Sequence, residues 1–347
     1  MPIKNSSVAV VASLAIAAGT VSAQARDRIH IVGSSTVFPY TEVVVRRFVD
    51  VAGVPEPILV STGTGGGMEQ ICSGVGEETP DITGASRPMT AQEFEICRQN
   101  GVMSISEAHI GYDGLSIAVS RDNPARWNLS FRDIYLALGA QVPVDGAWVD
   151  NPHVTWNEID PALPQVDIRV YGPPSTSGTR DAFVELAMHA GCRTLDFVVE
   201  GGYDETWIEE NCTRMRMDGR FVEFGENDEQ IVQALVSEPA ALGIFGYSFL
   251  FRNLEALKPV SVEGRVPDFR TIAELSYPLS RPLFLYIKND HRGHIPHLEE
   301  FIDFYMSDDA LSYGGYLLGY GLVPRDDEYL VDMQMSVMNG VRMAAPR

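Results

Sequence analysis

The chain contains few basic residues relative to acidic ones. Its 347 residues include 26 lysines and arginines against 47 aspartates and glutamates, which gives a formal net charge of −21. A protein that binds nucleic acid normally carries a basic face, and the sequence contains no cluster of that kind. We therefore do not expect nucleic acid as a partner. The acidic excess favours solubility, and it requires an anionic ligand to be bound by local donors against the overall field.

The sequence also lacks long apolar runs, apart from one short run near its start. Residues 1–25 contain Lys4, then the apolar stretch Val8–Ala18, then the small-residue sequence Ala23–Ala25. This order is typical of a cleaved secretory signal peptide, so we expect a periplasmic protein. A membrane anchor is the alternative, but the run is short for a span. No cysteine stands directly after the cleavage site, so we expect no lipid anchor on the mature chain. No other segment is long and apolar enough to cross a bilayer.

Cysteine is scarce, with four residues in the chain. In an exported protein, four cysteines suggest two disulfides, and three connectivities are possible. The choices that are local in sequence pair Cys72 with Cys97 and Cys192 with Cys212. The alternative is that some of the cysteines are free and buried.

The common catalytic motifs are missing. The turn at 63–67 has no lysine after it, so it is not a nucleotide-phosphate loop, and no full G-x-G-x-x-G or G-x-S-x-G is present. A serine hydrolase that uses Ser35 or Ser177 stays open, although no histidine stands in a suggestive place. We expect no catalytic residue and no cofactor.

The run DHRGHIPH contains three histidines that could suggest a metal site, namely His291, His294 and His297. The run lacks cysteine, and Pro296 with His297 is predicted to begin a helix. A solvated loop is the preferred interpretation, and no metal is expected.

Strand-like and helix-like apolar runs alternate along the chain, which indicates an α/β fold. The predicted strands are Ile29–Val32, Ile58–Val60, Leu115–Val119, Val166–Val170 and Leu283–Ile287. The predicted helices cover residues 39–51, 67–75, 178–190, 228–237 and 297–306. Residues 140–165 are rich in proline, aspartate and asparagine, and we expect a long loop there.

One layout occurs three times, in residues 29–40, 57–71 and 171–183. Each has a short apolar strand, a turn rich in glycine, serine and threonine, and then a helical apolar stripe. The beginning of a helix leaves backbone N–H groups unpaired and carries partial positive charge. Three such turns that meet in one cleft would form an oxyanion site. The alternative is that these residues are ordinary helix caps.

These motifs and their order resemble the phosphate-binding subunits of bacterial phosphate-specific ABC transporters. The resemblance covers nearly the whole mature chain and rests on GSSTVFP, STGTGGGMEQI, PDITGASRPM, YDGLSIAVS, SGTRDAF, ALGIFGYSF, RPLFLYIK and GYGLVP. It implies an α/β, two-lobed periplasmic-binding-protein fold of type II, in which each lobe is a mixed sheet flanked by helices. It also implies crossings between lobes near Tyr112–Gly114 and Tyr277–Pro282. Lobe 1 would comprise residues 26–111 and 281–347, and lobe 2 residues 112–280.

The resemblance also implies roles for individual residues. The phosphate-binding set carried over from the family, together with two arginines, is Ser35, Thr36, Val37 (through its amide), Thr64, Arg87, Ser177, Gly178, Thr179 and Arg180.

Two positions depart from the family pattern. Pro173 stands where the family has an arginine, and Arg87 stands where it has the aspartate that accepts the phosphate proton and rejects sulfate. The cation is therefore expected at Arg87, Arg180 or both, unless these arginines are structural ion-pair partners. Asp81 and Asp113 are the first candidates for a replacement acceptor, without which sulfate should compete.

The function implied by the resemblance is that of an exported receptor, not an enzyme. It would bind inorganic phosphate between its lobes and deliver it, as a monomer, to an inner-membrane ABC transporter permease. The alternatives are a receptor for another tetrahedral oxyanion such as sulfate, or an exported phosphate-ester hydrolase.

Overall fold

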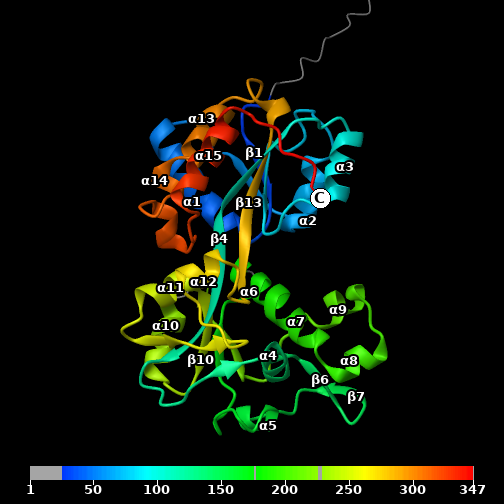
Figure 1. Cartoon of the computed structure of the whole chain (residues 1–347), viewed down its shortest axis with the longest axis vertical. Helices are drawn as coiled ribbons and strands as arrows, with labels where there is room; N and C mark the ends of the chain where they lie inside the picture. The colour runs from blue at the N-terminus through cyan, green and yellow to red at the C-terminus, as the bar shows by residue number, and fades with distance from the viewer. Residues whose placement is uncertain (1–25, 176, 226–228, 347) are drawn as a thin grey trace, which may run out of the picture.

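Two long strands, β4 (Ile105–Ser120) and β13 (Ser280–Lys288), run through the middle of the molecule and join an upper and a lower lobe (Figure 1). The computed structural model describes residues 26–175, 177–225 and 229–346. The predicted signal peptide, residues 1–25, lies outside the described residues. No helix in the described part of the chain has the length and apolar character needed to span a bilayer.

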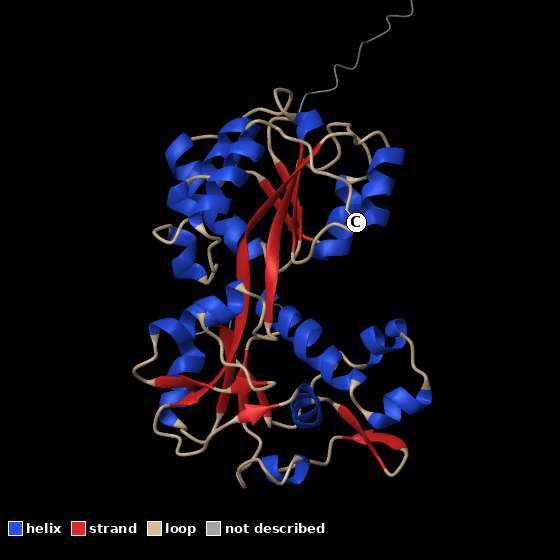
Figure 2. Cartoon of the chain, in the orientation of Figure 1, coloured by secondary structure: helices blue, strands red, loops and turns tan. Residues whose placement is uncertain are grey.

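The upper lobe is a mixed sheet with helices on both faces (Figure 2). Its further strands are β1 (His30–Gly33), β2 (Ile58–Ser61) and β3 (Ile82–Ala85). Its helices are α1 (Phe38–Ala52), α2 (Gly63–Ile71), α3 (Ala91–Gln99), α13 (Leu298–Tyr305), α14 (Asp308–Leu311) and α15 (Asp327–Met338), with 3-10 turns η2 (Asn289–His291) and η3 (Tyr316–Tyr320).

The lower lobe has its own strands and helices, supplied by one continuous stretch of chain. The strands are β5 (Asn128–Leu129), β6 (Gln141–Val144), β7 (Ala147–Asp150), β8 (Val170–Gly172), β9 (Phe221–Glu223), β10 (Leu242–Gly246), β11 (Leu257–Pro259) and β12 (Ser261–Val262). The helices are α4 (Phe131–Leu138), α5 (Trp156–Ile159), α6 (Gly178–Phe183), the π-helical turn η1 (Val184–Met188), α7 (His189–Arg193), α8 (Asp196–Gly201), α9 (Glu205–Asn211), α10 (Glu229–Ser237), α11 (Tyr247–Arg252) and α12 (Phe269–Ala273).

The sheet connects the lobes through shared strands. Its order is β2-β1-β3-β13-β4-β10-β8-β9, and β11 also pairs with β4. Strands β1, β2 and β3 are parallel, and β13 pairs antiparallel with β3 and with residues 105–114 of β4. Residues 115–119 of β4 pair instead with β10. One strand therefore serves both lobes, and the α1 and α2 turns follow parallel strands whose carboxyl ends share one edge.

The apolar pattern explains how α1 is placed. Pro39 lies in its first turn, where a missing N–H costs no helical hydrogen bond, and Gly53 ends it in the left-handed conformation. Its buried face includes Tyr40, Val44 and Phe48, which lie four residues apart and pack into the upper core. The first turn of the helix consequently lies at the cavity between the lobes, which Phe38, Pro39 and Tyr40 line.

Separate apolar cores lie in the two lobes. The largest cluster takes its members from residues 112–279 together with Val323. Two others take theirs from residues 29–110 and 283–337. Along β4 and β13, buried residues on one side of the crossing therefore belong to the lower core, and those on the other side belong to the upper cores.

Several predicted boundaries are wrong for identifiable reasons. The predicted loop 140–165 contains the β6–β7 hairpin and α5. Helix α2 begins four residues before the predicted 67, because its glycines lie within the helix and not before it. A Cβ at Gly67 would lie 2.6 Å from the Gly33 Cα, so glycine here permits close packing of the helix on β1. Helix α13 begins at Leu298, after His297, so Pro296 precedes it.

Both sequence-local disulfides are present, one in each lobe. Cys72 is bonded to Cys97, and Cys192 is bonded to Cys212. The first links the end of α2 to α3, and the second links α7 to the end of α9. No free cysteine occurs among the described residues.

Candidate functional site

The turns before α1 and α6 meet directly across the cleft. A Cβ placed on Gly178 would lie 2.3 Å from the Ser35 carbonyl oxygen, so only glycine permits this approach of the two lobes. Figure 1 shows α6 at the boundary between the lobes. The first and third recurring turns of the sequence are thereby brought together.

The turn before α2 joins the same region through a side-chain contact. The Thr64 and Ser86 hydroxyl oxygens lie 3.1 Å apart, and the Ser86 amide donates to Thr64 Oγ1 at 3.1 Å. Thr64 and Ser86 line one cavity together with Ser35 and Thr36. All three turns therefore contribute to one continuous site.

Two cavities share the wall made by Ser35 and Thr36. The smaller has a volume of about 340 Å³, and the larger has a volume of about 960 Å³. The smaller cavity is lined by Ser34, Ser35, Thr36, Gly63, Thr64, Gly65, Ser86, Arg87, Asp181, Glu185 and Arg281. The larger cavity adds Ser177, Gly178 and Thr179 of the lower lobe to that wall.

The hydroxyl groups at the shared wall differ in what they contact. Ser177 Oγ accepts a hydrogen bond from the Thr179 amide at 3.2 Å and so caps α6. Thr36 Oγ1 accepts from the Arg281 guanidinium. Within the described residues, the Ser35 and Thr179 hydroxyls have no protein partner, which leaves them available to a ligand.

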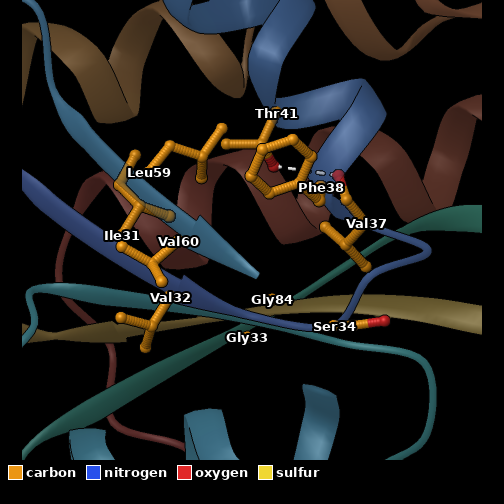
Figure 3. Close-up of a pocket in the computed structure, with 10 residues that line it drawn as sticks. All are labelled: Ile31, Val32, Gly33, Ser34, Val37, Phe38, Thr41, Leu59, Val60 and Gly84. Carbon is orange, nitrogen blue, oxygen red and sulfur yellow. Dashed lines mark hydrogen bonds between the residues drawn. The ribbon is translucent and has the colours of Figure 1, made fainter. Parts of the chain in front are cut away.

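Val37 faces the core and not the cavities. Figure 3 shows its side chain among apolar residues between α1 and the sheet, beside Gly84, and the space there is only about 10 Å³. Its carbonyl accepts from the Thr41 hydroxyl at 3.1 Å. Only the backbone amide of Val37 could therefore contact an anion.

Arg87 lies at the edge of the smaller cavity, but its charge is already paired. Its two terminal nitrogens donate to the two carboxylate oxygens of Glu93, at 2.9 and 2.8 Å. This paired hydrogen bond raises the pKa of Arg87. Glu93 is itself held by the capping box at the start of α3. The structure thus supports the ion-pair alternative for Arg87.

Arg180 lines neither of the two cavities. Its guanidinium lies 4.5 Å from the centre of the Phe221 ring and contacts Glu223 at 3.2 Å and the Pro173 carbonyl at 3.3 Å. Burial lowers its pKa. The expectation that Arg180 faces the anion is corrected by this geometry, because its side chain turns from the start of α6 toward β9.

The arginine that reaches the shared wall is Arg281, which the sequence interpretation did not select. It lies at the start of β13 and is 5% exposed. One terminal nitrogen donates to Thr36 Oγ1, and the other donates to Glu185 Oε2 at 2.9 Å. Its Nε has no hydrogen-bond partner among the described residues and lies 3.6 Å from Asp113 Oδ2. Its position ahead of the apolar run PLFLYI was a signal that could have identified it.

Carboxylates surround Arg281 from the crossing strand β4 and from the lower lobe. Asp113, on β4, is 7% exposed, and burial raises its pKa. The Tyr40 hydroxyl donates to Asp113 Oδ1 at 3.3 Å. Glu185 and Asp181 line the smaller cavity from the opposite side. Three carboxylates therefore lie on or near Arg281.

Asp81, the other suggested acceptor, is remote from the cavities. It is fully buried and contacts Arg26, the His30 amide and His291. His291 is thus part of a buried ion-pair cluster, contrary to the solvated loop that its sequence predicted. Within residues 26–175, 177–225 and 229–346, no group of histidine, cysteine, aspartate and glutamate is arranged to hold a metal ion.

Comparisons with known sequences identify relatives over most of the chain. A family model described as a PBP superfamily domain matches residues 18–309. The chain is 31% identical over 303 residues to Protein SphX of Synechocystis sp., covering 85% of this chain and 78% of that protein. It is 29% identical over 295 residues to Phosphate-binding protein PstS of Staphylococcus saprophyticus, covering 81% of this chain and 76% of that protein.

Solved structures give a concordant result. A possible phosphate binding protein from Planctomyces limnophilus has a TM-score of 0.71 and 27% identity, covering 91% of this chain and 99% of that one. An ABC-type phosphate transport receptor from Vibrio cholerae has a TM-score of 0.55 and 19% identity, covering 86% of this chain and 100% of that one. The second similarity concerns the fold alone.

Proposed function

Because the chain belongs to the PBP superfamily, we propose that it is an exported receptor that binds inorganic phosphate between its lobes and delivers it to an inner-membrane ABC transporter. The observation that carries this proposal is the buried Arg281 at the wall where hydroxyl groups from both lobes meet. A cation and several hydroxyls at one point are what a desolvated oxyanion requires. The relatives named for phosphate binding support the choice of anion.

The phosphate would occupy the wall shared by the two cavities. Donors from the upper lobe would be Ser35, Thr36, the Val37 amide and Thr64, and donors from the lower lobe would be Ser177, Gly178 and Thr179. Arg281 would supply the cation because its guanidinium reaches Thr36 at the wall. Arg87 is held at both terminal nitrogens by Glu93, and Arg180 lines neither cavity. Each charge-assisted hydrogen bond of this kind contributes about 1.5–3 kcal/mol.

The division into lobes gives the site its means of opening. We propose that residues 26–111 and 281–347 move as one body and residues 112–280 as the other. Rotation about the two crossings, at residues 112–114 and 277–282, would separate Gly178 from Ser35 and admit the ligand. The change of apolar cluster along β4 and β13 supports these boundaries.

The carboxylates around Arg281 bear on selectivity. Three carboxylates, Asp113, Asp181 and Glu185, lie on or near Arg281, so a fully deprotonated dianion meets repulsion that a protonated oxygen would relieve. Phosphate retains a proton that it can donate to a carboxylate, whereas sulfate has none at neutral pH. We therefore expect phosphate to be preferred, in contrast to the sulfate competition expected from Arg87.

The remaining features belong to the same proposal. Cleavage after residue 25 would release a monomer into the periplasm, where both disulfides would be stable. A receptor without turnover is proposed because the serines at the wall lack a histidine partner among the residues lining the two cavities.

Titration calorimetry with phosphate, sulfate, arsenate and molybdate tests this function on the mature chain. We expect micromolar or tighter phosphate binding, about −8 kcal/mol or better, and much weaker sulfate binding. A preference for sulfate, or release of phenol from phenyl phosphate at enzymatic rates, would refute the proposal.

A further inference from the structure

The larger cavity exceeds what an inorganic oxyanion can fill. Its volume is about 960 Å³, and it continues from Ser35 and Thr36 toward α11 and η3. A tetrahedral oxyanion has five heavy atoms, which at about 30 Å³ each, as for water in the liquid, need about 150 Å³. Volumes of roughly 300–1,000 Å³ are typical of sites for larger organic ligands.

Contacts between the lobes already exist on both sides of this cavity. At one side, Gly178 lies against the Ser35 carbonyl. At the other, Arg252 of α11 donates to the Gly319 carbonyl at 3.0 Å and lies 4.7 Å from the centre of the Phe249 ring. The cavity is therefore bounded by residues that already touch between the lobes.

Beyond the hydroxyl wall, the cavity is lined by four aromatic side chains as well as by the charged residues Glu42, Asp113 and Arg252. Phe38 and Tyr40 contribute from α1, Phe249 contributes from α11, and Tyr320 contributes from η3. The glycines Gly246, Gly319 and Gly321 add no side-chain bulk to the wall. Tyr320 is 53% exposed, so part of this aromatic surface has no cover within the chain. Aromatic faces of this kind suit a flat, uncharged ring.

We propose that this cleft accepts phosphate monoesters with a ring-bearing organic group, as well as free phosphate. The phosphate would bind at Ser35 and Thr36, and the organic group would lie in the larger cavity among Tyr40, Phe249 and Tyr320. This inference rests on the proposed phosphate-binding function. It extends the ligand class from an inorganic ion to an organic phosphate.

Calorimetry on the mature chain with inorganic phosphate and phenyl phosphate tests the inference. We expect phenyl phosphate to bind within tenfold of inorganic phosphate, or more tightly. Binding of phosphate together with a more than tenfold weaker affinity for phenyl phosphate would overturn the inference and leave the phosphate receptor intact. Failure of both anions to bind would overturn the receptor function itself, and this inference with it.

A cavity-filling variant locates the organic group. A side chain at Gly319 would meet no atom within 4 Å, and its backbone does not need the left-handed conformation. We expect Gly319→Leu to weaken phenyl phosphate at least tenfold and to change phosphate affinity less than twofold. Equal effects on both ligands, or none on either, would contradict the proposal.

Gly314→Leu is the matched control. Gly314 lies on the same segment, is exposed, and lines the neighbouring groove but not the larger cavity. This variant should leave both affinities unchanged, and a selective loss equal to that of Gly319→Leu would place the organic group in the groove and overturn the assignment. Should Gly319→Leu fail to fold, Phe249→Leu provides the same test. We expect this variant to lose three- to tenfold in affinity for phenyl phosphate and none for inorganic phosphate. An unchanged phenyl phosphate affinity would oppose the proposal.

Discussion

The start of β13 and the loop after β3 each bring one arginine to the smaller cavity, yet the two arginines differ in their surroundings. Arg281 is 5% exposed and contacts Thr36 of the upper lobe, Asp113 of the crossing strand β4 and Glu185 of the lower lobe. The Arg87 side chain is 40% exposed and is bound at both terminal nitrogens by Glu93, six residues away in sequence. An arginine in a binding motif is less available to an anion when one neighbouring carboxylate holds both of its terminal nitrogens. Four experiments test this difference, and the one expected to weaken phosphate binding most comes first.

Removing the Arg281 guanidinium should have the largest effect. Arg281→Leu removes the one cation at the shared wall that is not occupied in a bidentate pair, and it leaves Asp113 buried without its counter-charge. Phosphate affinity should fall by about 3 kcal/mol, more than a hundredfold. Calorimetry measures the loss, and thermal unfolding monitored by circular dichroism shows whether the variant is folded.

Arg281→Lys is the conservative control. It keeps a positive charge but loses the planar fork, so it should recover part of the affinity and not all of it. Unchanged affinity in both folded variants would remove Arg281 from the site.

Single hydroxyl deletions on the two lobes should each cost less. Thr36→Ala removes the hydroxyl that accepts a hydrogen bond from Arg281. Ser177→Ala removes a hydroxyl that the lower lobe contributes to the wall. We expect each to weaken phosphate binding by about 1.5–3 kcal/mol, the range for a hydrogen bond to a charged group. If neither titration changes, the anion binds elsewhere.

The pH dependence of stability tests the charge balance around Arg281. Burial raises the pKa of Asp113 in the folded chain, so between the unfolded value and this raised value the folded state binds more protons than the unfolded state. The free energy of unfolding contributed by Asp113 therefore falls as pH rises through that window. Asp113→Asn should flatten this part of the profile in urea unfolding measured from about pH 4 to 8. A profile of the variant that keeps the wild-type slope would contradict a raised pKa of Asp113 in the folded chain.

Arg87 should have the smallest effect of the four. Arg87→Leu breaks a partly exposed ion pair, for which we expect about 0.2–1 kcal/mol in the free energy of unfolding. Phosphate affinity should change less than threefold, because the guanidinium is already occupied by Glu93. A loss as large as that of Arg281→Leu would reverse the assignment of the two arginines.

Features that depend on neighbours in sequence were predictable. The alternation of strands and helices, the glycine, serine and threonine turns, and both disulfides are all local patterns, and the structure contains them. The sequence interpretation missed the hairpin within 140–165. The proline-rich, polar composition of this segment indicated a loop, and the alternation of side chains in β6 and β7 extends over only four residues each. Helix α2 was placed too late because its glycines resemble a turn, while their role is to allow close packing on Gly33.

The sequence by itself determined which groups are available at the turns and where the chain changes from strand to helix, because backbone propensity and capping act over a few residues. The tertiary structure alone decided which charges meet. Residues Thr36, Asp113, Glu185 and Arg281 are separated by up to 245 positions, and they come together because β4 and β13 cross between the lobes side by side. Arg87 and Arg180 were selected for their place in motifs, yet Glu93 holds both terminal nitrogens of Arg87, and Arg180 turns away from both cavities toward Glu223. Side-chain direction and the position of competing partners are properties of packing, which local sequence does not encode.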